Sequence, residues 1–200
     1  MLRDVVYDYL WTQIREKQFK PGEFVNLNLI SQKLGVSRTP LREALIVLEA
    51  EGFVQILPKR GIYIKPLTLQ DTYNLYEAIG ALESSIIMSV WSKIDENFIR
   101  TLERINGEIA ACTDYARHYE LNHEFHFAYI NLSENTEIKN YLGRLYQRIY
   151  DFSGINYGQK FQSAGHAEFI RLLREGNPVS SADYLRDVHW KFRVPEVFHA

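Results

Sequence analysis

Three of the six histidines have spacings that would let their imidazoles meet in a folded chain. His126 follows Asn122 by four residues, so an α-helix places both side chains on one face. His166 opens a later segment with a helical pattern and His189 closes another, and side chains from facing helices form metal sites inside bundles. The pattern fits a divalent metal site, and it also fits a polar pocket held by hydrogen bonds and water. The remaining histidines are interpreted as surface or core residues: His118, His123 and His199.

A second set of side chains is suited to contact nucleic acid. Arg38, Thr39 and Arg42 stand at the start of a predicted helix. An arginine can donate two hydrogen bonds to one guanine edge, and a threonine hydroxyl suits a phosphate oxygen. Lys59 and Arg60 lie in a predicted turn, where their charges can neutralise a phosphate backbone. The pattern favours a DNA-binding surface over a small α/β domain whose surface is incidentally basic.

Three predicted helices position the first part of this surface. Apolar residues recur at helical spacing over residues 2–18. A short helix is expected over 28–34, with Gly35 as its C-terminal stop. Ser37 is expected to cap a third helix that ends near residue 52. Two helices joined by a tight glycine turn are typical of a helix-turn-helix.

A β-hairpin is predicted directly after the third helix. Residues 53–57 and 62–64 are rich in β-branched and aromatic side chains, and the turn-forming residues 58–61 join them. A basic hairpin that follows a recognition helix is typical of a wing. The sequence therefore predicts a winged helix-turn-helix domain over residues 1–66.

The remainder, residues 67–200, is predicted to form an all-helical domain. No strand pattern occurs after residue 66, and Asp95, Asn135 and Asn177 have the residue types that begin helices. Six helices are expected, over residues 69–92, 95–111, 113–133, 135–153, 158–175 and 179–193. The predicted fold class is mostly α, with a winged helix-turn-helix followed by a six-helix antiparallel bundle.

Charge and composition agree with this division. Residues 1–66 hold ten basic and seven acidic side chains, a net charge of +3, whereas the rest holds 13 basic and 18 acidic, a net charge of −5. A basic recognition module followed by an acidic regulatory one gives this asymmetry. No apolar run is long enough for a membrane span, no signal peptide is evident, and Cys112 has no partner for a disulfide. We therefore expect a cytoplasmic protein that does not contact a membrane.

The first domain also resembles a known family. The motifs LGVSRTPLREAL at 34–45 and LEAEGFV at 48–54 closely resemble those of the GntR superfamily of transcriptional regulators, and FKPGE at 19–23 matches as well. The resemblance covers residues 4–66. It implies that five residues contact DNA: Ser37, Arg38, Thr39, Arg42 and Gly61.

The second domain resembles the FCD ligand-binding domain of the FadR subfamily, through short motifs distributed over residues 69–193. The matching residues are Leu75-Tyr76-Glu77, Leu82-Glu83, Asn122, Phe125-His126, Asn135, His166, Ala182 and His189. Six helices rather than seven indicate the VanR-like branch. Many such domains bind a divalent metal through one aspartate and three histidines. The resemblance therefore implies a zinc-like or nickel-like ion on Asn122, His126, His166 and His189.

The chain departs from these family patterns in three places. Asn28 lies where some relatives have a basic DNA contact, and Asn122 replaces an aspartate ligand with an uncharged amide. Ile79 lies where relatives often place an effector-binding arginine, so a carboxylate effector would lose one anchor. Four side chains of the segment 135–153 are candidates to replace it: Arg144, Tyr146, Arg148 and Tyr150.

These features lead us to expect a ligand-responsive repressor that binds a near-palindromic operator in double-stranded DNA as a homodimer. An organic acid or a sugar derivative is the expected effector. One alternative is a DNA-binding dimer with a metal-free pocket or no effector. Another is a metal-dependent enzyme, but no HExxH motif occurs, and Glu124 lies beside the helix face of His126 rather than on it. We therefore expect no enzymatic activity.

Overall fold

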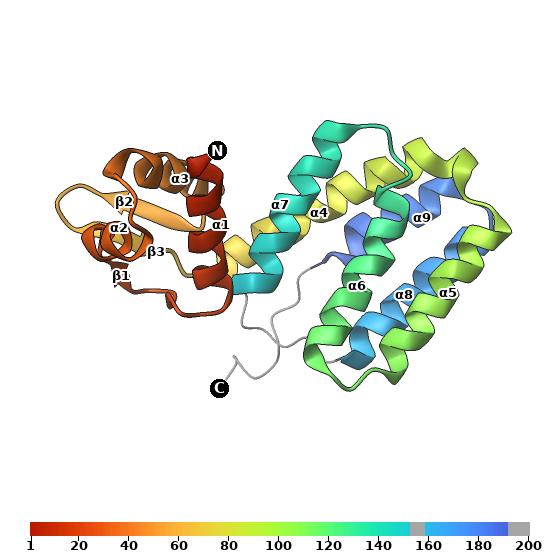
Figure 1. Cartoon of the computed structure of the whole chain (residues 1–200). Helices are drawn as coiled ribbons and strands as arrows, with labels where there is room; N and C mark the ends of the chain where they lie inside the picture. Colours follow the sequence, from red (N-terminus) through yellow and green to blue (C-terminus); the bar gives the residue numbers. More distant parts are fainter. Residues whose placement is uncertain (153–158, 192–200) are drawn as a thin grey trace. The chain divides into compact units, whose positions relative to one another are not determined.

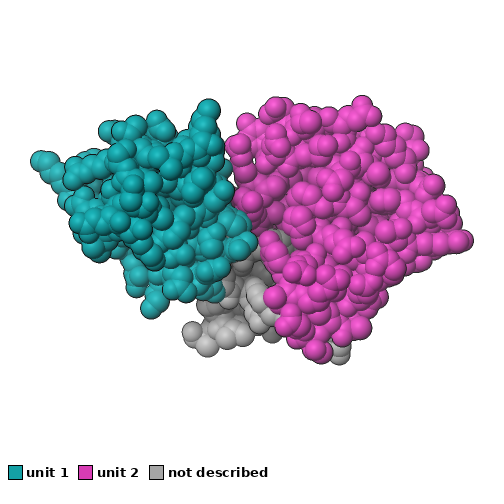
Figure 2. All heavy atoms as spheres, in the orientation of Figure 1, with its two compact units in different colours: residues 1–68, 151–153 teal, residues 69–150, 154–200 magenta. Residues whose placement is uncertain are grey.

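The computed structural model describes residues 1–152 and 159–191, and its elements divide between two compact units (Figures 1 and 2). One unit consists mainly of residues 1–68, and the other begins at Leu69. Within the described ranges, no helix is both long enough and apolar enough to cross a bilayer.

The first unit contains three helices and a small antiparallel sheet. Its elements are α1 (Leu2–Arg15), β1 (Phe24–Val25), α2 (Leu27–Leu34), α3 (Arg38–Ala50), β2 (Val54–Leu57) and β3 (Gly61–Ile64). Strand β3 lies between β1 and β2, and Ile56 of β2 pairs with Ile62 of β3. The predicted helix-turn-helix and hairpin are confirmed. Strand β1 was not predicted, because two residues are too few to show an alternating pattern.

The core of this unit comes from the buried faces of all three helices and the sheet. Helix α1 packs against α3, and α3 also packs against β2. The fully or nearly fully buried side chains are Val6, Leu10, Ile14, Ile30, Leu41, Ala44, Leu45, Leu48, Phe53, Val54, Ile62 and Ile64. Gly35 ends α2 in the left-handed conformation, as the sequence predicted, and α3 begins three residues later.

All the regular elements in the described part of the second unit are helical. Its elements are α4 (Leu69–Val90), the 3₁₀ turn η1 (Trp91–Lys93), α5 (Glu96–Ala111), α6 (Tyr115–Ile130), α7 (Thr136–Phe152), α8 (Gln159–Arg174), α9 (Pro178–Tyr184) and the π-helical turn η2 (Leu185–His189). The six predicted helices are confirmed. The last one differs in kind, because it continues beyond Tyr184 as a π turn rather than as α-helix.

Side-chain caps explain where several of these helices begin. The carboxylate of Asp95 accepts from the backbone N–H of Phe98, and the amide oxygen of Asn177 accepts from that of Val179. Asn135 likewise accepts from the N–H of Ile138. Each bond satisfies a helix N–H that has no partner within the helix.

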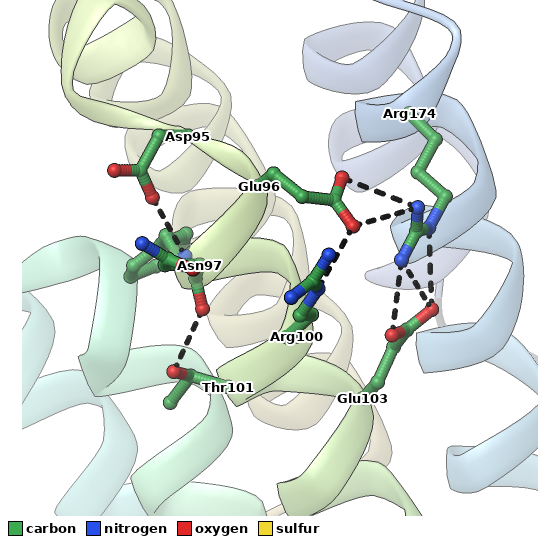
Figure 3. A network of polar contacts seen from close by, with 8 residues as sticks. Asp95, Glu96, Asn97, Arg100, Thr101, Glu103 and Arg174 are labelled. Carbon is green, nitrogen blue, oxygen red and sulfur yellow. Dashed lines mark hydrogen bonds and ion pairs between the residues drawn. The ribbon is translucent and has the colours of Figure 1, made fainter.

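Helices α5 and α8 pack side by side, and an ion-pair network joins them (Figure 3). The guanidinium of Arg174 on α8 lies 3.1 Å from Glu96 and 3.0 Å from Glu103, both on α5. Arg100 pairs with the same Glu96 carboxylate. A network in which charges share partners holds geometry better than an isolated surface pair. It therefore helps to fix α8, the helix that carries His166.

Candidate functional site

The start of α3 presents the predicted DNA contacts to solvent. Ser37 is the N-cap residue, but its side chain makes no capping hydrogen bond, so the predicted capping role is confirmed in position only. Arg38, Thr39 and Arg42 are all exposed on the first turns of α3. The guanidinium of Arg38 donates to the side-chain oxygen of Asn28 on α2 at 3.1 Å. This end of α3 thus offers polar groups that the fold of the unit does not bury.

The hairpin between β2 and β3 carries the remaining predicted contacts. Lys59 and Arg60 are exposed, and Arg60 lies over the ring of Phe24 at 5.2 Å. Gly61 has φ +106°, and a Cβ there would lie 3.2 Å from the backbone oxygen of Val25. Only glycine accommodates both the conformation and the close approach of β1. The role of Gly61 in this structure is therefore to shape the turn that presents the two basic side chains.

In the second unit, three of the predicted ligands converge. The Nε2 atom of His126 lies 3.3 Å from Nε2 of His166 and 3.3 Å from Nε2 of His189. One nitrogen from each ring falls within a group whose members all lie within 4.8 Å of one another. His126 and His166 are fully buried, and His189 is partly buried. Helices α6 and α8 and the turn η2 each contribute one imidazole.

The positions of two of these histidines differ from the prediction. His166 lies in the middle of α8 rather than at its start, and its ring stacks on Phe125 with 3.9 Å between ring centroids. His189 ends the π turn η2, not an α-helix. The Nδ1 atom of His166 is buried and has no hydrogen-bond partner among the described residues. Within the same ranges, the ring's hydrogen-bonding contact is therefore the one that its Nε2 makes with His126.

A buried carboxylate that the sequence did not single out as a site residue completes the cluster. Glu83 of α4 is fully buried, and its Oε2 lies 3.2 Å from Nδ1 of His126. The same oxygen accepts from the hydroxyl of Tyr129 at 2.6 Å and from the indole N–H of Trp190 at 2.7 Å. Its other oxygen accepts from the hydroxyl of Tyr146. The cluster thus consists of three imidazoles with a carboxylate behind one of them.

The position of Trp190 depends on a glycine in α4. A Cβ at Gly80 would lie 2.9 Å from Cβ of Trp190 and 3.3 Å from Cα of Arg186. The absence of a side chain at Gly80 lets the end of η2 approach α4 closely. The indole consequently reaches Glu83, three residues further along the same helix.

Burial sets the protonation of the cluster. Burial lowers the pKa of His166 well below its ordinary value, and the charge of His126 adds to the effect. Burial likewise lowers the pKa of His189 to about 3, with His126 again contributing. For Glu83, burial would raise the pKa, but the charge of His126 and the hydrogen bonds from it and the two tyrosines outweigh burial and lower the pKa. His166 and His189 are therefore neutral at neutral pH, which is the form that ligates a metal.

The spacing of the nitrogens can be compared with that of a metal site. Tetrahedral zinc with Zn–N bonds of about 2.0–2.1 Å separates two ligand nitrogens by about 3.3–3.4 Å. In the structure, Nε2 of His126 lies 3.3 Å from Nε2 of His166 and from that of His189. A proton shared between the nitrogens would hold them at a similar distance. The three imidazoles therefore fit a divalent metal. Asn122, the fourth predicted ligand, is buried on α6 one turn before His126, which is as near to the cluster as its position along the helix places it.

The predicted effector contacts lie in varied environments. Ile79 is fully buried in α4, and Tyr146 is buried in the cluster through its bond to Glu83. Arg144 is exposed and lies over the ring of Tyr141, while Arg148 is partly buried, near the charge of Asp71. Neither observation links these arginines to the histidine cluster. The side chain of the remaining candidate lies outside the described part of the structure: Tyr150.

None of the other described histidines is one of the three converging imidazoles, although the charge of His118 contributes to lowering the pKa of His166 and that of His126 to lowering the pKa of His123. His118 is buried on α6. His123 is partly buried and stacks on Phe127 at 3.9 Å. His199 lies outside the described residues.

Glu83 did carry a signal in the sequence, because it stands in the buried stripe of α4 between Ile79 and Ile86, where an unpaired carboxylate would be costly.

Comparison with known families matches both units. The family of bacterial regulatory proteins called gntR matches residues 2–64, and the FCD domain matches residues 74–188. The Nta operon transcriptional regulator of Aminobacter aminovorans is 33% identical over 78% of this chain and 76% of its own length. The uncharacterised HTH-type transcriptional regulator YdhC of Bacillus subtilis is 30% identical over 76% of this chain and 69% of its own.

Solved structures share the fold at low sequence identity. McbR/YncC of E. coli superposes with a TM-score of 0.68 at 17% identity, over 94% of this chain and 93% of that one. A GntR regulator from Rhodococcus sp. RHA1 gives a TM-score of 0.68 at 20% identity, over 92% and 91% of the two chains. A winged helix-turn-helix followed by a helical FCD domain, with relatives that are regulators rather than enzymes, leads to one assignment: the chain belongs to the GntR family of transcriptional regulators and carries an FCD domain.

Proposed function

We propose that this protein is a ligand-responsive repressor that binds a near-palindromic operator as a homodimer. The observation that carries the DNA-binding part is the exposed, polar start of α3, where Arg38, Thr39 and Arg42 project from a helix that follows a glycine turn. Side chains at the start of a recognition helix read base edges in the major groove. Lys59 and Arg60 of the hairpin serve as phosphate contacts.

Dimerisation increases the selectivity of such a protein for its operator over other DNA. One winged unit makes a small interface with DNA, and two half-sites multiply the selectivity of one. A relative that is 30% identical over 60% of this chain and 54% of its own length is named the transcriptional repressor RspR, which supports the repressor role. Effector binding in the second unit would bias the relative placement of the two winged units and so alter operator affinity.

The test begins with selection of bound fragments from a DNA library, followed by affinity measurements at fixed salt. The proposal expects a selected sequence with two-fold symmetry and a light-scattering mass of twice the 23.5 kDa of one chain. Organic acids and sugar derivatives are then screened for those that raise the unfolding temperature and change operator affinity. Binding of all sequences with equal affinity, or a monomer bound to DNA, would overturn this proposal.

We further propose that the effector site of the second unit contains a divalent transition metal. His126, His166 and His189 would hold it through nitrogen, with Asn122 as an oxygen ligand. When bound, such an ion offers open coordination positions to the oxygens of a carboxylate or hydroxyl effector. The support comes from the convergence of three imidazoles, with Nε2 of His126 at a metal-like separation from Nε2 of each of the other two, and from the lowered pKa values of those two rings.

A metal-free polar pocket is the second candidate, and the uncharged amide of Asn122 favours it. Elemental analysis of the protein as purified, followed by zinc and nickel titration after chelator treatment, separates the two. A saturable stoichiometry of one ion per chain supports the metal site. Purified protein without metal and without saturable uptake would leave the histidines as the lining of a pocket.

A further inference from the structure

Glu83 belongs to the second unit, whereas the predicted DNA contacts all belong to the first, and its carboxylate has four hydrogen-bonding partners. It is fully buried in the middle of α4, and two buried apolar side chains lie about one helical turn from it, Ile79 before it and Ile86 after it. Burying a carboxylate costs free energy unless hydrogen bonds replace those that water provided. A carboxylate at such a position therefore requires hydrogen bonds to both of its oxygens.

Four donors from other parts of the second unit meet this carboxylate. They are His126 and Tyr129 on α6, Tyr146 on α7 and Trp190 directly after η2. The tyrosine hydroxyls and the indole N–H all donate, so the carboxyl group accepts on both oxygens. An ionised carboxylate is an acceptor only, and it is the form that satisfies such a set.

The same contacts determine which nitrogen of His126 carries a proton. Nδ1 of His126 lies 3.2 Å from Oε2 of Glu83 and 2.7 Å from the hydroxyl oxygen of Tyr129. The hydroxyl of Tyr129 already donates to Glu83, so both neighbours of Nδ1 can only accept from it. Nδ1 must therefore carry hydrogen, and the lone pair of Nε2 can face the other two imidazoles.

In the neutral form that ligates a metal, the candidate ligands carry no charge, since they are three imidazoles and one amide. We propose that Glu83 is a positioning residue of this site, which keeps the proton of His126 on Nδ1 and supplies from behind the ring the negative charge that the ligands lack. This inference rests on the proposed metal site. A carboxylate that accepts from the second nitrogen of a ligating histidine both orients the ring and strengthens it as a ligand.

The experiment measures zinc affinity by competition with a chelator in the full-length protein. Glu83→Gln keeps the shape of the side chain and removes its charge, and it is expected to weaken zinc binding about 10- to 100-fold. Asn122→Asp places a charge among the ligands instead. In the Glu83→Gln background it is expected to restore affinity to within about tenfold of wild type. Tyr146→Phe is the matched control, because it removes one hydrogen bond from Glu83 but leaves the charge, and it is expected to change affinity least.

Each outcome has a distinct meaning. Unchanged affinity in Glu83→Gln, with zinc bound normally by wild type, overturns the role of Glu83 and leaves the metal site standing. Weak binding that Asn122→Asp does not restore overturns the charge role, because a purely structural defect would not respond to a charge placed elsewhere. Wild-type protein that takes up no zinc overturns the metal site and this inference together.

A second measurement does not depend on the variants folding. In zinc-loaded wild type labelled with ¹⁵N at histidine, the His126 ring is expected to keep hydrogen on Nδ1 and to coordinate through Nε2. A His126 ring that coordinates through Nδ1 would overturn the inference, because Glu83 would then face a nitrogen without a proton.

Discussion

In the winged unit the candidate contacts stand outside the core, whereas in the helical unit the candidate ligands belong to the core. Arg38 and Arg42 are exposed on α3, and the opposite face of that helix buries Leu41, Leu45 and Leu48. The histidine cluster instead occupies the interior of a bundle and replaces apolar packing with a polar network. The difference implies that DNA affinity can be altered without a cost in stability, while any change at the cluster alters binding and stability together.

The largest effect should come from removal of one imidazole. His189→Ala is expected to weaken zinc binding by more than the roughly 100-fold that loss of an outer partner can cost, because a ligand itself is lost. Titration of chelator-treated protein measures it. His123→Ala is the control, since His123 is also partly buried but stacks on Phe127 instead of joining the cluster. Equal zinc affinity in the two variants would remove His189 from the ligand set.

The next effect separates the two units. Arg38→Ala and Arg42→Ala are each expected to lose about 1–3 kcal/mol of operator affinity, while the unfolding temperature stays within error of wild type. Fluorescence anisotropy with labelled operator at fixed salt gives the affinity. Arg3→Ala is the control, because it removes the same charge from α1, outside the helix-turn-helix and the hairpin. If operator affinity falls equally in all three variants, the effect comes from the loss of positive charge in general and not from contacts made by the start of α3.

A third effect concerns pH and should appear in the helical unit alone. The folded pKa of His189, about 3, lies below its ordinary value of 6.5, so between these values the unfolded chain binds a proton that the folded chain does not. The contribution of His189 to the free energy of unfolding is therefore fully present above pH 6.5 and is lost as the pH falls toward 3. The loss by pH 5 should be about 2 kcal/mol from this group, and His166 acts in the same direction.

Urea unfolding of chelator-treated Trp11→Phe protein measures this loss, because its two remaining tryptophans both lie in the second unit. His189→Gln should make the dependence on pH shallower, since the glutamine does not titrate. A free energy of unfolding that is constant from pH 7 to pH 5 would show that His166 and His189 are not both neutral in the folded protein.

The smallest effect is expected from the hairpin. Lys59→Ala and Arg60→Ala should each lower the slope of log affinity against log salt by about 1, and they should weaken operator and unrelated DNA alike. Affinities measured at several salt concentrations give the slope. Selective loss of operator binding in either variant would instead place that residue among the base contacts.

The two regions also differed in how far the sequence predicted them. The turn at Gly35 and the starts at Asp95, Asn135 and Asn177 were predictable, because caps and turns depend on residues close in the sequence. The exposed basic residues of α3 and the hairpin could be proposed for the same reason. Strand β1 was missed because its pairing with β3 joins residues almost 40 positions apart and only two residues take part.

The cluster was predicted in part. Spacing placed Asn122 and His126 on one face and indicated that His166 and His189 could meet a third imidazole, and a family resemblance implied all four as metal ligands. Glu83 could not be recognised as part of the site, because its partners lie between 43 and 107 residues away along the chain. Only the folded bundle shows that one carboxylate unites donors from three distant segments.

The π turn η2 has a consequence for insertions and deletions rather than for substitutions. It holds an extra residue within one turn, and both His189 and Trp190 reach the cluster from its end. Deletion of a single residue from Leu185–His189 would let the segment wind as ordinary α-helix and rotate the residues after the deletion by about 100°. Such a deletion would carry the imidazole and the indole away from His126 and Glu83 at once, although it removes neither of them. The length of this turn is therefore as much a part of the site as the identity of its residues.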